Sequence, residues 1–142
     1  MRKGARTLRG QLDPSEIRQL VVDDGIFTNG LRITYFTVWM DSFSTSLGVG
    51  ACLSLRDVIN PGSGDFPAND PSCFAWAAQF PGSANNQFYT WERLDPDHIV
   101  NEELFLHNRG TQPLNYLIVA EPYIMTEDEG VLQLVKGKQQ SV

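Results

Sequence analysis

The oxygen-bearing side chains best suited to a hard cation lie near the start of the chain. Asp24-Gly25 and Asn29-Gly30 fall there, and the next acidic residue after them is Asp41. A calcium loop of the EF-hand type needs oxygen ligands at alternating positions and a closing glutamate at the twelfth. Asp-Gly and Asn-Gly pairs favour tight turns instead, because glycine adopts positive φ without steric cost. We therefore predict turns at both dipeptides and no metal site.

The two histidines are the next candidates for chemistry. His98 and His107 are nine positions apart, and an odd spacing on a regular strand places them on opposite faces. With two histidines in the chain, a three-histidine metal site is excluded. His98 and Glu102 could share a face, which leaves a two-ligand site as the weaker alternative. Because histidines are more often hydrogen-bonded or exposed polar groups, we predict no bound metal and no other cofactor.

No motif for nucleophilic or phosphate chemistry occurs in the chain. There is no G-x-S-x-G, no G-x-x-x-x-G-K-[ST] and no G-x-G-x-x-G that opens a helix. Glu102 and Glu103 are adjacent, so on a strand they face opposite ways and cannot alone form a glycosidase pair. Cys52 and Cys73 have no adjacent basic side chain and are predicted to be buried, reduced thiols. We expect no enzyme; a small metal-dependent β-sandwich enzyme is the alternative.

The elements that would position these residues are mostly strands. Residues 31–40 predict a central strand that is covered on both sides, because both of its faces are apolar. Ile33, Tyr35 and Trp39 lie on one predicted face, and the even-numbered apolar residues lie on the other. A short helical turn is predicted at residues 13–16, which contain a proline at an allowed first position.

Further strands alternate with loops that are rich in proline and glycine. They are predicted at residues 50–58, 73–80, 87–94, 98–108 and 114–124, with the second and third forming a hairpin. A capping box at Thr126 and Glu129 predicts a short helix over residues 126–138. The residues predicted to be largely buried are Phe36, Trp39, Leu104, Leu106, Tyr116 and Ile118.

These elements predict a mainly β chain. About seven strands followed by one short C-terminal helix favour an antiparallel β-sandwich or jelly-roll-like domain over residues 13–142. The aromatics of residues 74–91 alternate along the chain, which is more typical of a core than of a sugar platform. A carbohydrate or subunit contact through exposed aromatics is the alternative.

Charge is distributed unevenly along the chain. Arg2, Lys3, Arg6 and Arg9 precede every acidic residue, and the remainder carries seven basic against 17 acidic side chains. We predict that residues 1–12 form a flexible basic arm that pairs with an acidic surface of a partner subunit. Direct nucleic-acid binding is not expected, because four cations supply few phosphate contacts and the acidic remainder opposes them.

Length and composition set the remaining bounds. A chain of 142 residues with 42% apolar and 20% charged residues is expected to form one globular domain. Its apolar runs fall short of the ~18 residues that a membrane span needs, so no membrane partner is expected. The basic start is not followed by an apolar stretch, so no signal peptide is predicted. With two cysteines, folding is expected in a reducing cytoplasm.

From Gln11 onward, the chain resembles small structural proteins encoded by tailed bacteriophages, especially marine ones. The resemblance lies in the order of three segments: DDG…GLRITYFTVW, then LDPDHIVNEELFLHN, then PLNYLIVAEPYIMTEDEGVLQLVKGK. These are scaffold motifs, so the resemblance carries over no catalytic residue.

The resemblance implies a virion component that is made in the host bacterial cytoplasm. The expected role is a capsid decoration (cement) protein that binds the shell in many copies. Its partners would be the major capsid protein or other virion subunits, together with further copies of itself. The alternatives are a tail or neck subunit, a carbohydrate- or receptor-binding β-sandwich module, and a host-directed interaction protein.

Overall fold

The chain forms eight strands and no helix over the residues that the structure describes. This computed structural model describes residues 6–21, 29–42, 47–59, 65–82, 87–100 and 103–124. The strands are β1 (Arg6–Leu12), β2 (Ile17–Val21), β3 (Asn29–Met40), β4 (Val49–Ser54), β5 (Cys73–Pro81), β6 (Phe88–Leu94), β7 (Glu103–Asn108) and β8 (Leu114–Ile124). The predicted helix over residues 126–138 lies outside the described residues.

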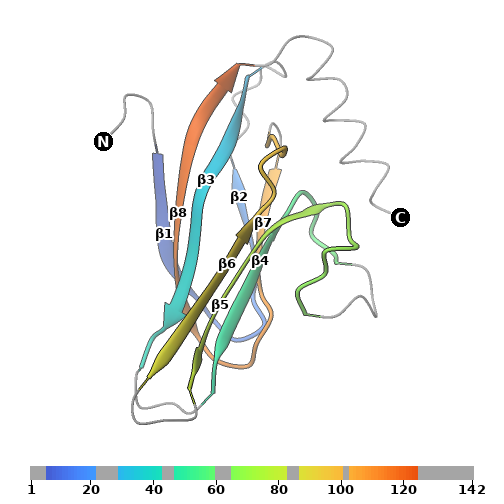
Figure 1. Cartoon of the computed structure of the whole chain (residues 1–142). Coiled ribbons are helices and arrows are strands. Elements are labelled where there is room, and N and C mark those ends of the chain that lie inside the picture. Colours follow the sequence, from blue (N-terminus) through green and yellow to red (C-terminus); the bar gives the residue numbers. More distant parts are fainter. Residues whose placement is uncertain are drawn as a thin grey trace.

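The strands pair into two antiparallel sheets. One sheet has the order β1-β8-β3, and the other has the order β2-β7-β4-β5-β6. Figure 1 shows the small sheet and the large sheet lying against each other. The prediction of a mainly β, sandwich-like fold is therefore confirmed. The first strands pair with the last ones, so most of the pairing joins residues that are distant in sequence.

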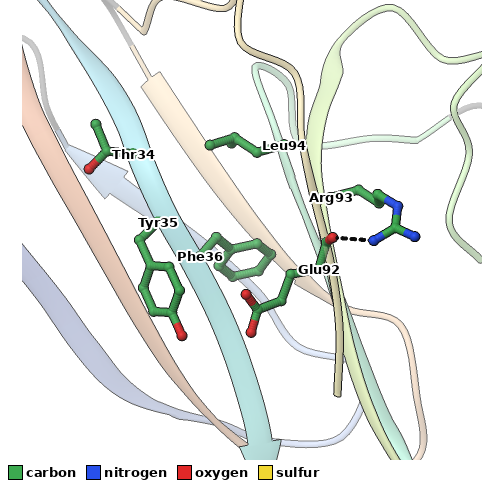
Figure 2. Close-up of a pocket in the computed structure, with 6 residues that line it drawn as sticks. All are labelled: Thr34, Tyr35, Phe36, Glu92, Arg93 and Leu94. Carbon is green, nitrogen blue, oxygen red and sulfur yellow. Dashed lines mark hydrogen bonds between the residues drawn. The ribbon is translucent and has the colours of Figure 1, made fainter. Parts of the chain in front are cut away.

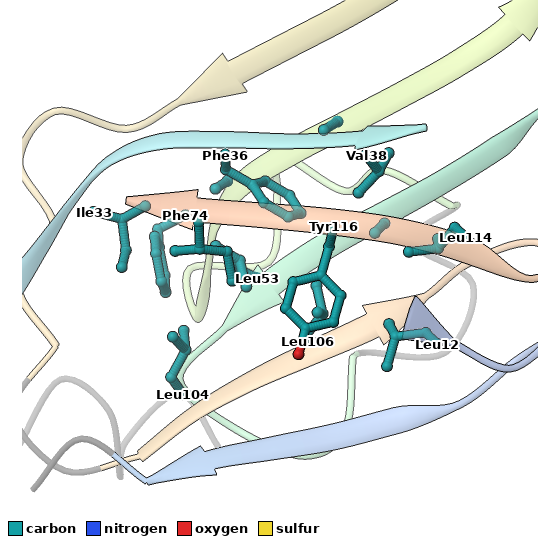
Figure 3. Packing of buried hydrophobic residues seen from close by; sticks show 14 of the residues in the cluster. Leu12, Ile33, Phe36, Val38, Leu53, Phe74, Leu104, Leu106, Leu114 and Tyr116 are labelled. Carbon is teal, nitrogen blue, oxygen red and sulfur yellow. The ribbon is translucent and has the colours of Figure 1, made fainter. Parts of the chain in front are cut away.

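The core lies between the two sheets, where apolar side chains from the inner faces meet (Figure 3). Alternation along each strand supplies these side chains, because successive residues of a strand point to opposite faces. Strand β4 is buried at all six positions, as it lies between β7 and β5 in the large sheet. Five residues that were predicted to be buried are confirmed: Phe36, Leu104, Leu106, Tyr116 and Ile118.

The prediction of a flexible arm is wrong for Arg6–Leu12. These residues form β1 and pair with β8 from Arg6↔Ala120 to Leu12↔Leu114. Leu12 is fully buried in the core. Leu8 and Leu12 lie on the inner face of β1 and Arg9 and Gln11 on its exposed face, which is the pattern of a half-buried strand. The remaining residues of the predicted arm lie outside the described residues.

A β-turn passes the chain from β1 in the small sheet to β2 in the large sheet. The Glu16 amide donates to the Asp13 carbonyl over 3.1 Å, and Ser15 has a φ of 59°. Proline at the second turn position suits this geometry because its φ is fixed near −65°. The helical turn that was predicted at residues 13–16 is therefore a single β-turn.

A β-bulge reverses the predicted facing of the first half of β3. The register with β8 shifts between Ile33 and Tyr35, which inserts one extra residue. Ile33 and Phe36 therefore both point into the core, although they are an odd number of positions apart. Tyr35 and Trp39 point outward and are 42% and 38% exposed. The predicted burial of Trp39 is wrong because it lies on the outer face of the small sheet, and the core lies against the inner face alone.

The turn predicted at Asn29-Gly30 is also wrong. Both residues belong to β3 and pair with Ile124 and Tyr123. Long-range pairing with β8 thus outweighs the local preference of the dipeptide for a turn. The turn predicted at Asp24-Gly25 lies outside the described residues.

The outer edge of β3 bonds to groups that are not part of a neighbouring strand. Leu31 and Val100 exchange two backbone hydrogen bonds of 2.7 and 2.8 Å. At the other end of the strand, the Met40 amide donates to Oε1 of Gln79, which reaches across from β5 over 2.9 Å. These contacts join the edge of the small sheet to the large sheet without merging the two sheets.

The outward and inward positions of β3 predict different mutational costs. We expect Phe36→Ala to lower the free energy of unfolding by about 3–5 kcal/mol, because it leaves a cavity in the core. We expect Trp39→Ala to cost about 1 kcal/mol or less, because the ring is partly in solvent. Urea denaturation of both variants measures the difference. Equal costs for the two variants would contradict the opposite facing of Phe36 and Trp39.

Candidate functional site

His98 is a structural group held in its neutral form. Its ring is 3% exposed and stacks on Phe74 with 4.3 Å between the ring centroids. Nε2 accepts the Ile33 amide proton over 2.9 Å, while Nδ1 contacts the Asp95 carbonyl. A ring whose Nε2 accepts must carry its proton on Nδ1, which donates to that carbonyl. The expectation of a hydrogen-bonded histidine is confirmed for His98; Glu102, its alternative metal co-ligand, lies outside the described residues.

His107 lies beside a serine, an arrangement that sequence reasoning missed. Its Nε2 is 2.8 Å from Ser54 Oγ and 3.2 Å from the Arg56 carbonyl, and Ser54 Oγ also bonds that carbonyl. The hydroxyl proton thus goes to the carbonyl and the imidazole donates to Oγ, the reverse of an activated nucleophile. Both side chains are essentially inaccessible to solvent. Burial lowers the pKa of His107, which favours its neutral form.

The two thiols lie on neighbouring strands of the large sheet, Cys52 on β4 and Cys73 on β5. Cys52 and Cys73 are free and buried, and they pack with Ile59 and Trp76. Burial raises the pKa of Cys73 to about 12 and raises the pKa of Cys52 further still. A thiol with so high a pKa is protonated at neutral pH and is a poor nucleophile. The prediction that both thiols are buried is confirmed.

A buried ionic pair is formed by two residues that lie between β4 and β5 in the sequence. Asp70 is fully buried, and its Oδ1 accepts from the amide and the hydroxyl of Ser72 over 3.0 and 2.7 Å. Its Oδ2 is 3.9 Å from Nη2 of Arg56. In the part of the chain that the structure describes, no group of three or more His, Cys, Asp or Glu side chains could hold a metal. No helix in that part is long and apolar enough to cross a membrane.

The depressed pKa of His107 predicts a pH-dependent stability. The unfolded chain binds a proton near the usual histidine pKa of about 6.5, whereas the folded chain resists it. Stability is therefore full above that pH and falls as the pH drops, by up to about 1.4 kcal/mol per pH unit. Denaturation midpoints between about pH 7.5 and 5.5 measure this slope.

The matched variant is His107→Gln, which keeps a donor near Ser54 but does not titrate. Its stability should depend less steeply on pH than that of the wild type. His98 is present in both proteins, so the difference in slope isolates His107. Identical slopes would contradict the account of a neutral, buried imidazole.

A small cleft separates β3 from β6 where the two sheets meet at their edges (Figure 2). Its volume is about 220 Å³. The Glu92 carboxylate lies within it and accepts the Thr37 hydroxyl over 2.7 Å. Arg93 is turned away, donating to the Glu92 backbone carbonyl over 2.7 Å with its guanidinium over the Trp91 ring. Because its one carboxylate already bonds to Thr37, we interpret this cleft as a contact between the two sheets and not as a ligand site.

A larger hollow lies on the outer face of the small sheet. Its volume is about 610 Å³, and it is lined by Arg9, Gly10 and Gln11 of β1, Trp39 of β3, and Asn115, Tyr116 and Leu117 of β8. Register places Gln11, Asn115 and Trp39 in one row across the sheet. Arg9 lies in the next row, beside Leu117. The hollow thus combines an aromatic ring, two amides and one cation.

An aromatic strip occupies the outer face of the large sheet along β5 and β6. It consists of Phe66, Phe80, Tyr89 and Trp91. The rings of Phe80 and Tyr89, which are 45% and 49% exposed, lie 5.8 Å apart, and those of Phe66 and Trp91 lie 5.4 Å apart in a T-shaped pair. The alternation that predicted a core thus places several of these rings at the surface, because they lie on the face of the large sheet that points away from the core.

Two glycines leave room for rings of the strip to lie close to the backbone. A Cβ at Gly50 would lie 2.3 Å from Phe66, and one at Gly82 would lie 2.5 Å from Tyr89. A side chain at either position would displace the ring above it. The positions of Phe66 and Tyr89 in the strip therefore depend on glycine at these two sites.

The basic residues predicted to bind a partner are not all placed by the structure. Arg6 and Arg9 lie in β1, where Arg9 lines the hollow, while Arg2 and Lys3 lie outside the described residues. Trp39 was not predicted as a surface residue, because both faces of residues 31–40 were expected to be covered. In comparisons with known proteins, no family model, no curated protein and no solved structure matches this chain.

Proposed function

We propose that this protein is a non-enzymatic virion structural protein, a capsid decoration protein that binds the shell of a tailed phage in many copies. Its resemblance to small phage structural proteins supports this role, and so does its sandwich-like fold. The observation that carries the proposal is the aromatic strip. It offers a surface for attachment to another protein.

The strip has the composition of the centre of a protein interface. Aromatic residues are enriched at interface centres, and contiguous apolar patches on a surface mark sites of interaction. Phe80 and Tyr89 expose nearly half of their surfaces to water, and an apolar partner would remove that surface from solvent. Their rings are already held by packing, so binding costs little side-chain entropy.

Charge favours a protein partner over nucleic acid. The whole chain carries a net charge of −6, which opposes contact with phosphates. The major capsid protein, repeated over a symmetric shell, is the proposed partner, with neighbouring copies of this chain in contact on it. Attachment through Arg2, Lys3, Arg6 and Arg9 remains a prediction. A tail or neck subunit would attach through the same strip.

The test is incorporation into particles. Tagged variants are supplied in cells that are infected by a phage lacking its own copy of the gene, and purified particles are assayed by quantitative mass spectrometry. The wild-type chain should be present in many copies per particle. The double variant Phe80→Ala/Tyr89→Ala should be incorporated at least tenfold less, because the rings that meet the partner are lost.

The matched control is Val58→Ser, which removes an apolar side chain that is 54% exposed and lies outside the strip. It should be incorporated as well as the wild type. Absence of the wild-type chain from purified particles would refute the virion role. Normal incorporation of the double variant would refute attachment through the strip, and a few copies per particle would favour the tail or neck.

A further inference from the structure

We propose that the hollow on the outer face of the small sheet binds an acidic oligosaccharide, one that contains a sugar carboxylate. This inference does not rest on the proposed virion role. It rests on three kinds of side chain that the register of β1, β8 and β3 brings together: an exposed indole, a pair of amides and one guanidinium.

The indole of Trp39 provides an apolar platform. It is 38% exposed on the solvent side of β3, and it borders the hollow. A pyranose ring has one face of C–H groups that packs against an aromatic ring, while its hydroxyls remain at the rim. An exposed indole beside polar groups suits an amphipathic ligand such as a sugar better than a purely apolar one.

Two amides flank this platform in the same row of the sheet. Gln11 Nε2 donates to Asn115 Oδ1 over 3.4 Å, which holds the two side chains together across β1 and β8. This bond uses one donor of Gln11 and one lone pair of Asn115, and each amide has further donors and lone pairs. Paired donors and acceptors at a fixed spacing match the neighbouring hydroxyls of a sugar.

Arg9 selects for a carboxylate. It is the cation of the hollow, and it lies one row from the amide pair on β1. A guanidinium binds a carboxylate through two parallel hydrogen bonds, which are stronger than bonds between neutral groups. A uronic acid unit beside a sugar stacked on Trp39 would satisfy both side chains. The volume of about 610 Å³ is within the range of small-ligand sites, roughly 300–1,000 Å³.

The size of the ligand follows from the other exposed aromatic of this face. Tyr35 is four residues before Trp39 on β3, and both rings point outward. Four residues of a strand span about 13 Å. One sugar ring cannot reach both aromatics, so the face is better suited to a chain of several units than to a monosaccharide.

The experiment compares two tetrasaccharides that share N-acetylglucosamine but differ in charge. The acidic probe is a hyaluronan tetrasaccharide, which contains glucuronic acid, and the neutral probe is chitotetraose. Binding to the full chain is measured by ligand-observed NMR and by titration of tryptophan fluorescence. The wild type should bind the acidic probe at least tenfold more tightly than the neutral one, and added salt should reduce that preference.

Two variants separate the roles of the side chains. Trp39→Ala should weaken binding of the acidic probe at least tenfold, whereas Arg9→Gln should remove the preference for the acidic probe but retain binding of the neutral one. Ile17→Ala, which removes an exposed apolar side chain of β2, should bind like the wild type. Circular dichroism verifies that each variant is folded.

Three results would overturn the proposal. They are no saturable binding of either probe by the wild type, binding by Trp39→Ala that equals the wild type, and equal affinity of the wild type for the acidic and the neutral probe. Each result bears on the hollow alone. Incorporation into particles depends on the strip on the other sheet, so the two proposals can fail separately.

Discussion

The fold depends on how the outer edge of β3 is closed. Side chains of the large sheet and its connecting segment bond this edge in place of another strand: His98 accepts the Ile33 amide and Gln79 accepts the Met40 amide, each over 2.9 Å. Buried backbone donors without partners cost free energy, and open edges invite pairing with other chains. These bonds satisfy both donors and hold the two sheets against each other along one side.

The bonded edge of β3 leaves the outer faces of the two sheets as the surfaces available for binding. Because β3 is tied to the large sheet at Ile33 and Met40, the residues between them have a fixed facing, with Phe36 inside and Trp39 outside. The hollow and the aromatic strip then lie on the outer faces of opposite sheets, which point away from each other. A partner bound to the strip would therefore leave the hollow open to solvent.

The strands with strong alternation were predictable, and the weakly patterned ones were not. Residues 73–80 and 87–94 were expected as a hairpin and form β5 and β6. β1 was not predicted, because its arginines suggested a basic arm. The strand that it pairs with, β8, lies more than 100 residues away in the sequence. The hollow could not be predicted either. It depends on the long-range register that aligns Gln11, Asn115 and Trp39 in one row across the small sheet.

Native-state hydrogen exchange of the Ile33 and Met40 amides tests the closure of the edge most directly. Both protons should exchange far more slowly than those of an exposed strand edge, because one is bonded to Gln79 of β5 and the other to His98, which follows β6. Gln79→Ala should speed exchange at Met40 and leave Ile33 protected, and His98→Phe should do the reverse. Fast exchange of both amides in the wild-type protein would contradict the closed edge and the facing of β3 that follows from it.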